Sequence, residues 1–224
     1  MKSLQYQIQP MLIYIDLDGP ILDVSERYYR AHCDILKSLG LGKGIISKEK
    51  YWALKRRKAK LKEICPDLTA KTEVLYKNKW LKLIEDKKYL IYDKAWPYAK
   101  NELKLLSKRN LLTLVTIRQE KKKLLPELKG FGLYKYFDGI LLGGSRNAFN
   151  AKAKFILNDK KFKRENAIMI GDTEVDIISA KECKIKTVAV LCGIRNLTFI
   201  KKLNPDFIVR NLSSARKLIL SGRV

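Results

Sequence analysis

Two aspartates stand one residue apart at the end of an apolar run near the start of the chain. Met11 to Ile15 is typical of a buried strand, and Asp16 and Asp18 follow it in the stretch IYIDLDGPILD. Two carboxylates this close repel each other, so a buried strand that ends in them needs something to offset their charge. The pair is therefore the first candidate for a functional site.

A second acidic cluster, IMIGDTEVDI, repeats this arrangement, with Asp172 after a short apolar strand and Asp176 four residues later. Adjacent strands of a parallel sheet would bring Asp16, Asp18 and Asp172 into one crevice, where carboxylates repel by several kcal/mol. A hard divalent cation removes this repulsion, and oxygen ligands suit Mg²⁺ better than zinc. A capping aspartate in a loop would explain either cluster alone, but two at strand ends favour a metal site.

Two further side chains have the chemistry to hold an anion. The strand LLTLVTIR ends near Thr116, whose hydroxyl can donate to a phosphate oxygen. In NAKAKFIL we expect a helix with Asn150 as its N-cap, which places Lys152 in the first turn. A cation there opposes the helix dipole unless an anion lies nearby. Lys152 and Lys154 point about 200° apart on a helix, so only one faces the site; we favour Lys152.

The elements that position these residues alternate along the chain. The expected strands are Met11–Leu17, Leu111–Ile117, Gly139–Leu142, Ala167–Ile170, Thr187–Leu191 and Phe207–Val209. The expected helices between them are Pro97–Lys108, Glu120–Lys129, Ala151–Asn158, Val175–Cys183 and Leu212–Leu220. This alternation predicts an α/β fold, a doubly wound parallel sheet with ligands at the carboxyl ends of its strands.

Residues 24–95 interrupt the alternation. They contain no convincing strand and include long helix-favouring stretches, such as Glu49–Ile64 and Glu73–Asp86. We expect an inserted all-helical cap formed by residues 24–95, with residues 1–23 and 96–224 forming the α/β core.

Four motifs in order now carry a family resemblance: DLDGPILD, TIR with Thr116, the lysine at 152, and GDTEVDI. Together they resemble the haloacid dehalogenase-like (HAD) superfamily, whose core is a Rossmann-like sheet. The insertion is similar to the helical cap of the phosphoglycolate phosphatase-like and β-phosphoglucomutase-like branch. The Lys-Pro pair common in the third motif is absent here, so the choice between Lys152 and Lys154 stays open.

The resemblance implies a role for each candidate residue. Asp16 would be the nucleophile that forms an aspartyl-phosphate, and Asp18 the general acid and base. Mg²⁺ would be bound by the carboxylate of Asp16, the backbone carbonyl of Asp18 and the carboxylate of Asp172, with Asp176 acting behind them. Thr116 and Lys152 would hold the phosphoryl group, and Gly19 would turn the chain and present an amide to the phosphate. The implied activity is a Mg²⁺-dependent phosphatase acting on a small phosphorylated metabolite.

Composition limits the alternatives. The single histidine, His32, argues against a Ser-His-Asp triad or a His-rich zinc site. Four scattered cysteines without CxxC spacing are expected to be free thiols in a reducing compartment. No apolar run is long enough to span a bilayer, and the N-terminal MKSLQYQIQP lacks the apolar core of a signal peptide. We therefore expect a cytoplasmic protein without a membrane partner, either a monomer or a weak dimer.

The net charge of +24 keeps a different class of function open. Such a charge favours anionic partners, although lysines spread over the whole chain also make an ordinary solvated surface. Nucleic acid is an unlikely partner on this composition, but it is not excluded. The alternatives to the phosphatase are a phosphomutase or a dehalogenase on the same fold, and a basic nucleic-acid- or anion-binding protein without turnover.

Overall fold

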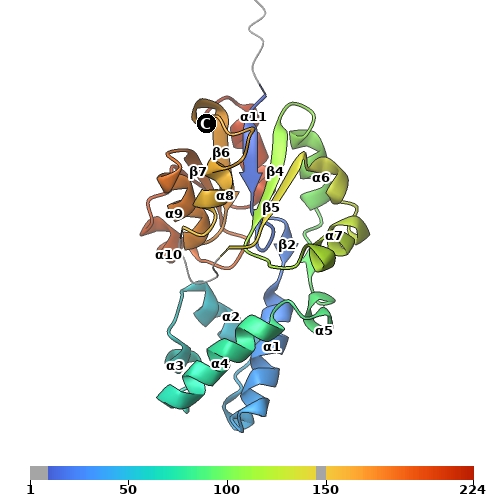
Figure 1. Cartoon of the computed structure of the whole chain (residues 1–224). Coiled ribbons are helices and arrows are strands. Elements are labelled where there is room, and N and C mark those ends of the chain that lie inside the picture. The colour runs from blue at the N-terminus through green and yellow to red at the C-terminus, as the bar shows by residue number, and fades with distance from the viewer. Residues whose placement is uncertain (1–9, 145–149) are drawn as a thin grey trace, which may run out of the picture.

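A computed structural model describes residues 10–144 and 150–224 of the chain (Figure 1). The N-terminal segment on which the expectation of no signal peptide rests lies, up to residue 9, outside the described residues. The described part contains a six-stranded sheet, helices on both of its faces, and a group of helices beyond the carboxyl ends of the strands.

The main sheet is parallel throughout, as predicted. Its strands lie in the order β5-β4-β1-β6-β7-β8, so β1 is central, between β4 and β6. Their bounds are β1 Leu12–Ile15, β4 Leu111–Thr116, β5 Gly139–Leu142, β6 Ala167–Gly171, β7 Lys186–Val190 and β8 Phe207–Val209. After β1 the chain adds β4 and β5 on one side of this strand, and then β6, β7 and β8 on the other. The carboxyl end of β1 therefore lies at the switch in strand order, where such sheets bind ligands.

Alternating apolar side chains of β1 serve the two faces of the sheet. Ile13 and Ile15 belong to one cluster, with buried residues from α6 (Ala99–Leu106), α7 (Lys121–Gly130) and α11 (Leu212–Leu220). Leu12 and Tyr14 belong to a second cluster, with residues from α8 (Ala153–Leu157) and α9 (Glu174–Glu182). The short α10 (Leu197–Lys201) packs with α9 on this second face. Both faces are therefore covered, which explains why β1 is apolar at every position.

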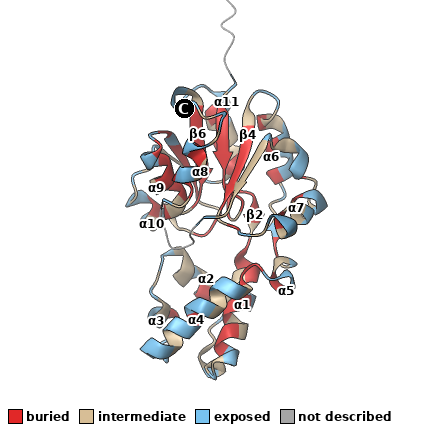
Figure 2. Ribbon diagram, in the orientation of Figure 1, coloured by how far each residue is buried: buried red, intermediate tan, exposed pale blue. Residues whose placement is uncertain are grey.

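The insertion contains a group of helices with small apolar clusters of their own, referred to below as the cap helices or the cap. Its helices are α1 Ser25–Ser38, α2 Lys48–Arg56, α3 Leu61–Ile64, α4 Ala70–Leu83 and α5 Lys87–Leu90. Figure 2 shows that α1 is buried over much of its length, whereas much of α4 is exposed. The buried apolar residues of α1 pack with residues of α4 and α5. The chain enters and leaves the cap through a two-stranded antiparallel ribbon, β2 (Leu22–Asp23) with β3 (Lys94–Ala95). The ribbon therefore holds the two segments that connect the cap to the rest of the chain next to each other.

The helix-favouring stretch from Glu49 to Ile64 forms two helices and not one. α2 ends at Arg56 and α3 begins only at Leu61. Between them Lys58 adopts a left-handed conformation with φ of 58°, and the helix is closed by a hydrogen bond from the amide of Ala59 to the carbonyl of Leu54 at 3.0 Å. The break lets the chain turn so that Leu61 packs against the cap core.

All four cysteines are free thiols. None of the helices in the described part of the chain combines the length and the apolar character needed to cross a membrane.

The end of α9 offers a test of the local backbone. Lys184 follows the helix with φ of 56°, and the amide of Ile185 bonds back to the carbonyl of Ala180 at 3.0 Å. Only glycine adopts this conformation without steric cost. We expect Lys184→Gly to raise the free energy of unfolding by about 1 kcal/mol, measured by urea denaturation. Lys184→Ala is the matched control and should bring no such gain; equal stabilisation by both variants would contradict this explanation.

Candidate active site

The sheet register brings the two acidic clusters together. Ile15 pairs with Ile170, and the amide of Asp16 donates to the carbonyl of Ile170 at 3.0 Å. Asp16 and Asp172 thus follow neighbouring strand ends, and both are buried. Carboxylate oxygens of Asp16, Asp172 and Asp176 all lie within 4.8 Å of one another. Asp16, Asp172 and Asp176 therefore form one acidic cluster, whereas Asp18, which we expected in the same crevice as Asp16 and Asp172, is not among these three.

Lys152 is the cation of this cluster. Its Nζ lies 2.7 Å from Oδ1 of Asp16 and 2.6 Å from Oδ1 of Asp176, and the residue is only 1% exposed. Burial alone would lower the pKa of Lys152, but Asp16 and Asp176 together raise it above its usual range. Lys154 is exposed. The structure therefore places Lys152, and not Lys154, among the carboxylates.

The lysine reaches the site from a turn rather than from a helix, which corrects one expectation. α8 begins at Ala153, and Asn150 is not its N-cap. The Asn150 side chain instead donates to Glu182 at 2.7 Å, and its carbonyl accepts the amide of Ala153 at 2.9 Å. The amide of Lys152 donates to Oγ of Ser179 on α9 at 3.2 Å. These bonds fix the turn from which the side chain of Lys152 enters the acidic cluster.

Asp176 has both oxygens occupied by the protein. Oδ1 binds Lys152, and Oδ2 accepts the amide of Asp172 at 3.0 Å and both the amide and the hydroxyl of Thr173 at 2.9 Å. Asp176 therefore orients the lysine and the start of α9. Among the described residues, Oδ2 of Asp16 and Oδ1 of Asp172 accept no hydrogen bond, which leaves these two carboxylates with an oxygen available to a ligand.

Two aspartates of this cluster, Asp16 and Asp172, have raised pKa values. Burial raises the pKa of Asp16 to about 7 despite Lys152, and Asp176 and Asp18 contribute to the rise. Burial also raises the pKa of Asp172 well above its usual range, and Asp176 and Asp16 add to this effect. A fully buried oxygen of Asp172 without a partner, in a site that offers only oxygen ligands, fits a small hard divalent cation.

Two glycines allow the chain to approach Asp172. Gly19 has φ of +113°, and a Cβ there would lie 2.4 Å from Cγ of Asp172; at Gly193 it would lie 2.0 Å from Oδ2. The expected free amide of Gly19 is not available, because it donates to the carbonyl of Leu22 at 2.9 Å and closes the turn after Asp18. The role of Gly19 is therefore close packing against Asp172.

Thr116 lies at the end of β4, the other neighbour of β1, and is buried. Its hydroxyl oxygen accepts the amide of Arg118 at 3.3 Å, so its hydrogen can still be donated to a ligand. This position agrees with a phosphate-binding hydroxyl at the strand end.

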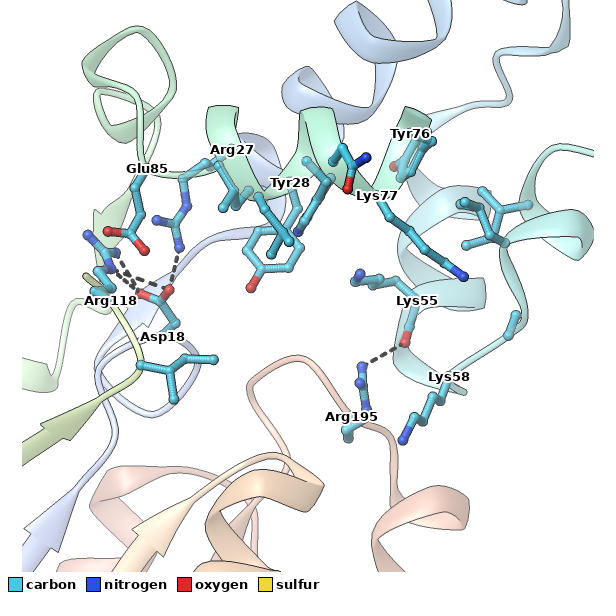
Figure 3. A pocket seen from close by; sticks show the side chains of 18 of the residues that line it. Asp18, Arg27, Tyr28, Lys55, Lys58, Tyr76, Lys77, Glu85, Arg118 and Arg195 are labelled. Carbon is cyan, nitrogen blue, oxygen red and sulfur yellow. Dashed lines mark hydrogen bonds and ion pairs between the residues drawn. The ribbon is translucent and has the colours of Figure 1, made fainter. Parts of the chain in front are cut away.

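Asp18 points into a different set of charges, which sequence reasoning missed. Its carboxylate lies 2.5 Å from Arg27 on cap helix α1 and 2.6 Å from Arg118 after β4 (Figure 3). Both arginines also pair with the buried Asp93, at 3.1 and 2.8 Å, and Arg118 contacts Glu127. The only sequence signal was that Arg118 stands two residues after Thr116. Arg27 and Asp93 gave none, because their pairing depends on how the cap meets the sheet.

These arginines shift the pKa of Asp18 in the opposite direction to that of Asp16. Burial alone would raise the pKa of Asp18, but Arg118 and Arg27 together lower it below its usual range. The side chain of Asp93 is more completely buried than that of Asp18, and burial raises its pKa to about 8 although Arg27 opposes this. Asp18 is therefore an ionised carboxylate in this arrangement.

A cavity of about 860 Å³ opens over Asp18 and Arg118, between the sheet and the cap. Its walls come mainly from α1, α2 and α4 of the cap and from the segments after β4 and β7. A volume of this size is typical of sites for small molecules. The cavity can thus hold a small ligand beside Asp18 and Arg118.

Comparison with known proteins agrees with this fold. The family described as "Haloacid dehalogenase-like hydrolase" matches residues 13–190. A protein of Caldanaerobacter subterraneus provisionally named pyrophosphatase PpaX is 28% identical, with 92% of this chain and 93% of that protein covered. The phosphoglycolate phosphatase of Vibrio parahaemolyticus is 24% identical, covering 93% and 95%. The crystal structure of a predicted phosphatase from Clostridium acetobutylicum superposes with a TM-score of 0.76 at 20% identity, covering 95% and 99%.

The family match extends from β1 to the end of β7 and includes Asp16, Asp18, Thr116, Lys152, Asp172 and Asp176. The chain belongs to the haloacid dehalogenase-like hydrolases.

The ion pairs of Lys152 predict a strong effect on stability. Lys152→Ala removes the only cation in contact with Asp16 and Asp176 in the described structure and leaves two buried carboxylates facing each other. We expect the free energy of unfolding to fall by about 3 kcal/mol in the presence of EDTA, measured by urea denaturation. Lys154→Ala is the control and should change it by less than about 0.5 kcal/mol. Equal losses in both variants would show that the lysine assignment is wrong.

The raised pKa values of Asp16 and Asp93, about 7 and about 8, predict how stability changes with pH. Both folded-state values exceed those of the unfolded chain, so the folded form retains protons that the unfolded form has released. This contribution is complete below the unfolded pKa and is lost as pH rises through the folded pKa. Without metal, we expect stability to fall by about 2 kcal/mol from pH 6.5 to 8. Urea denaturation in EDTA at several pH values measures this, and a constant or rising stability would contradict it.

Proposed function

We propose that the protein is a Mg²⁺-dependent phosphatase that hydrolyses a small phosphomonoester through an aspartyl-phosphate on Asp16. The observation that carries the proposal is the buried cluster in which Lys152 holds Asp16 beside Asp172, at the carboxyl edge of the sheet. Asp18, two residues after Asp16, lines a cavity of small-molecule size. The names of two similar proteins, a pyrophosphatase and a phosphoglycolate phosphatase, support hydrolysis of a phosphoryl bond.

In the first step a carboxylate oxygen of Asp16 attacks phosphorus, and the bond from phosphorus to the leaving oxygen breaks. Asp18 gives its proton to that leaving oxygen. In the second step a water molecule attacks the same phosphorus, Asp18 takes the proton of that water, and phosphate leaves with regeneration of the Asp16 carboxylate. Lys152 and the hydroxyl of Thr116 hold the negatively charged phosphoryl oxygens throughout.

The metal would be held by the carboxylates of Asp16 and Asp172 and by the backbone carbonyl of Asp18. In the described part of the chain that carbonyl accepts no hydrogen bond, as a ligand position requires. Bound Mg²⁺ would offset the repulsion between the carboxylates and the phosphoryl group. Asp176 would act on this centre indirectly by orienting Lys152 and Asp172, since its own oxygens already accept hydrogen bonds from Lys152 and from the amides at the start of α9.

The acid–base role of Asp18 requires a rearrangement. Its ion pairs with Arg27 and Arg118 keep it ionised, which suits a base but not an acid. To donate a proton, Asp18 must first lose at least one of these contacts. Arg27 belongs to cap helix α1, so a shift of the cap relative to the sheet would release it.

The remaining proposals concern the whole molecule. We propose that residues 24–95 act as a cap over a catalytic core formed by residues 1–23 and 96–224, in a cytoplasmic monomer or weak dimer. A second acid at Asp18 argues against a dehalogenase, which has no proton to move there. No described residue requires a phosphomutase, and the family match argues against a binding protein without turnover.

The proposed function is tested by phosphate release from a panel of phosphomonoesters. We expect activity with Mg²⁺ that disappears in excess EDTA and returns when Mg²⁺ is restored. Asp16→Asn should abolish turnover, since it removes the nucleophile and a metal ligand. Lys154→Ala, at an exposed position, should retain activity. Full activity in EDTA would overturn the metal role, and an active Asp16→Asn variant would overturn the nucleophile.

The leaving group distinguishes the role of Asp18 from that of Asp16. Asp18→Asn retains the backbone carbonyl but has no proton to transfer, so hydrolysis of an alkyl phosphate should slow by roughly 10²–10⁴-fold. p-Nitrophenyl phosphate needs little protonation of its leaving group, so the first step should slow less and phosphoenzyme should accumulate. Rapid-quench kinetics with both substrates measures this difference. Identical losses for the two substrates in the first step would exclude Asp18 as the acid.

A further inference from the structure

The cavity between cap and sheet has one end at Asp18 and another at a group of basic residues. Figure 3 shows Lys55, Lys58 and Arg195 across the cavity from Asp18 and Arg118. Lys55 and Lys58 come from α2 and the turn after it, and Arg195 comes from the segment between β7 and α10. The guanidinium of Arg195 also donates to the backbone carbonyl of Lys55 at 3.1 Å, which ties this end of the cap to the core.

Most cations that line the cavity already have carboxylate partners. Arg27 and Arg118 bind Asp18 and Asp93, as described above. Arg195 forms a two-pronged pair with Glu174 at 2.8 and 2.9 Å, and Lys58 reaches the same carboxylate at 2.8 Å. These groups are fixed by the protein itself.

Lys55 differs from them, because its Nζ makes no ion pair with any residue that the structure describes. The amine lies 4.8 Å from the centre of the Trp80 ring and 5.3 Å from that of Tyr28, two aromatic walls of the same cavity. Rings on these sides hold an ammonium in place but do not neutralise it. Burial and, to a smaller extent, Arg195 lower the pKa of Lys55 to about 8, and Glu174 offsets only part of this.

We propose that Lys55 binds a second anionic group of the substrate, at the end of the cavity opposite the scissile phosphoryl group. This inference rests on the proposed phosphatase function and assigns its substrate class: small phosphate esters or anhydrides that carry a carboxylate or a further phosphate. The bound anion provides the countercharge that Lys55 lacks in the protein. Trp80 and Tyr28 exclude water from that contact, which strengthens it.

Three substrates test the assignment with Mg²⁺ present. 2-Hydroxyethyl phosphate has a neutral tail, phosphoglycolate has a carboxylate tail of similar size, and pyrophosphate has a second phosphate. We expect the wild-type protein to have a higher kcat/KM for at least one of the two anionic-tail substrates than for 2-hydroxyethyl phosphate. Which of the two it favours identifies the tail.

Lys55→Met keeps the length of the side chain and removes its charge. We expect it to lower kcat/KM for the favoured anionic-tail substrate by about tenfold or more, chiefly through KM, as loss of a charge-assisted contact predicts. For 2-hydroxyethyl phosphate the change should be less than about twofold. Lys55→Arg should restore much of the preference. Lys82→Met, on the exposed side of α4 and outside the cavity lining, is the control and should alter neither substrate.

The outcomes separate this inference from the proposed function. If the wild-type protein hydrolyses all three substrates but Lys55→Met affects them equally or not at all, the subsite is wrong while the phosphatase stands. If the wild-type protein hydrolyses none of them and no other phosphomonoester, the proposed function fails and the subsite fails with it. Circular dichroism of each variant shows whether a loss reflects misfolding, in which case Lys55→Arg alone decides the question.

Discussion

One buried ammonium group determines how the functional end of this sheet is assembled. Lys152 connects Asp16, which follows β1, with Asp176 on α9, and Asp176 in turn holds the amides at the start of that helix. Carboxylates this close in a medium of low dielectric would otherwise drive the strand ends apart or take up protons. Because one cation serves several carboxylates, the cluster retains a net negative charge. That residual charge is why the site suits a divalent metal. The close approach of the chain to Asp172 separately requires glycine at positions 19 and 193, because a Cβ there would clash with its side chain.

A second ionic cluster sets the chemistry of Asp18 apart from that of Asp16. The two residues are neighbours in sequence, yet burial raises the pKa of one and arginines lower the pKa of the other. Environments that separate two titrating groups in this way are typical of sites that use them for different tasks. Since Arg27 lies on cap helix α1 and Arg118 lies in the core, the protonation of Asp18 is coupled to the position of the cap. The cap helices thus contribute both to the ion pairs of Asp18 and to the cavity above it.

The sequence was informative wherever local patterning determines structure. Apolar runs of strand length predicted the parallel sheet, and aspartates at the ends of two such runs predicted their convergence. Elements too short to have a period, such as α10 and the β2–β3 ribbon, gave no such signal. The left-handed Lys58 broke a stretch whose composition favours helix throughout. The choice of Lys152 over Lys154 as the lysine that faces the aspartates agrees with the structure, although Asn150 is not the N-cap of the helix. Side chains two positions apart point in different directions in a turn as they do in a helix, so only one of the two lysines reaches the site. The pairing of Arg27 with Asp93 depends on tertiary contacts alone.

The central claim is that Asp16 carries the phosphoryl group. Acid quench during turnover, followed by reduction with borohydride, converts an aspartyl-phosphate to homoserine, and peptide mass spectrometry locates that residue. The account predicts homoserine at position 16, formed only when substrate and Mg²⁺ are both present. Unmodified Asp16 in a protein that is turning over substrate rapidly, together with retained activity in Asp16→Asn, would contradict it. Water would then attack the substrate directly, and Asp16 would serve only as a ligand.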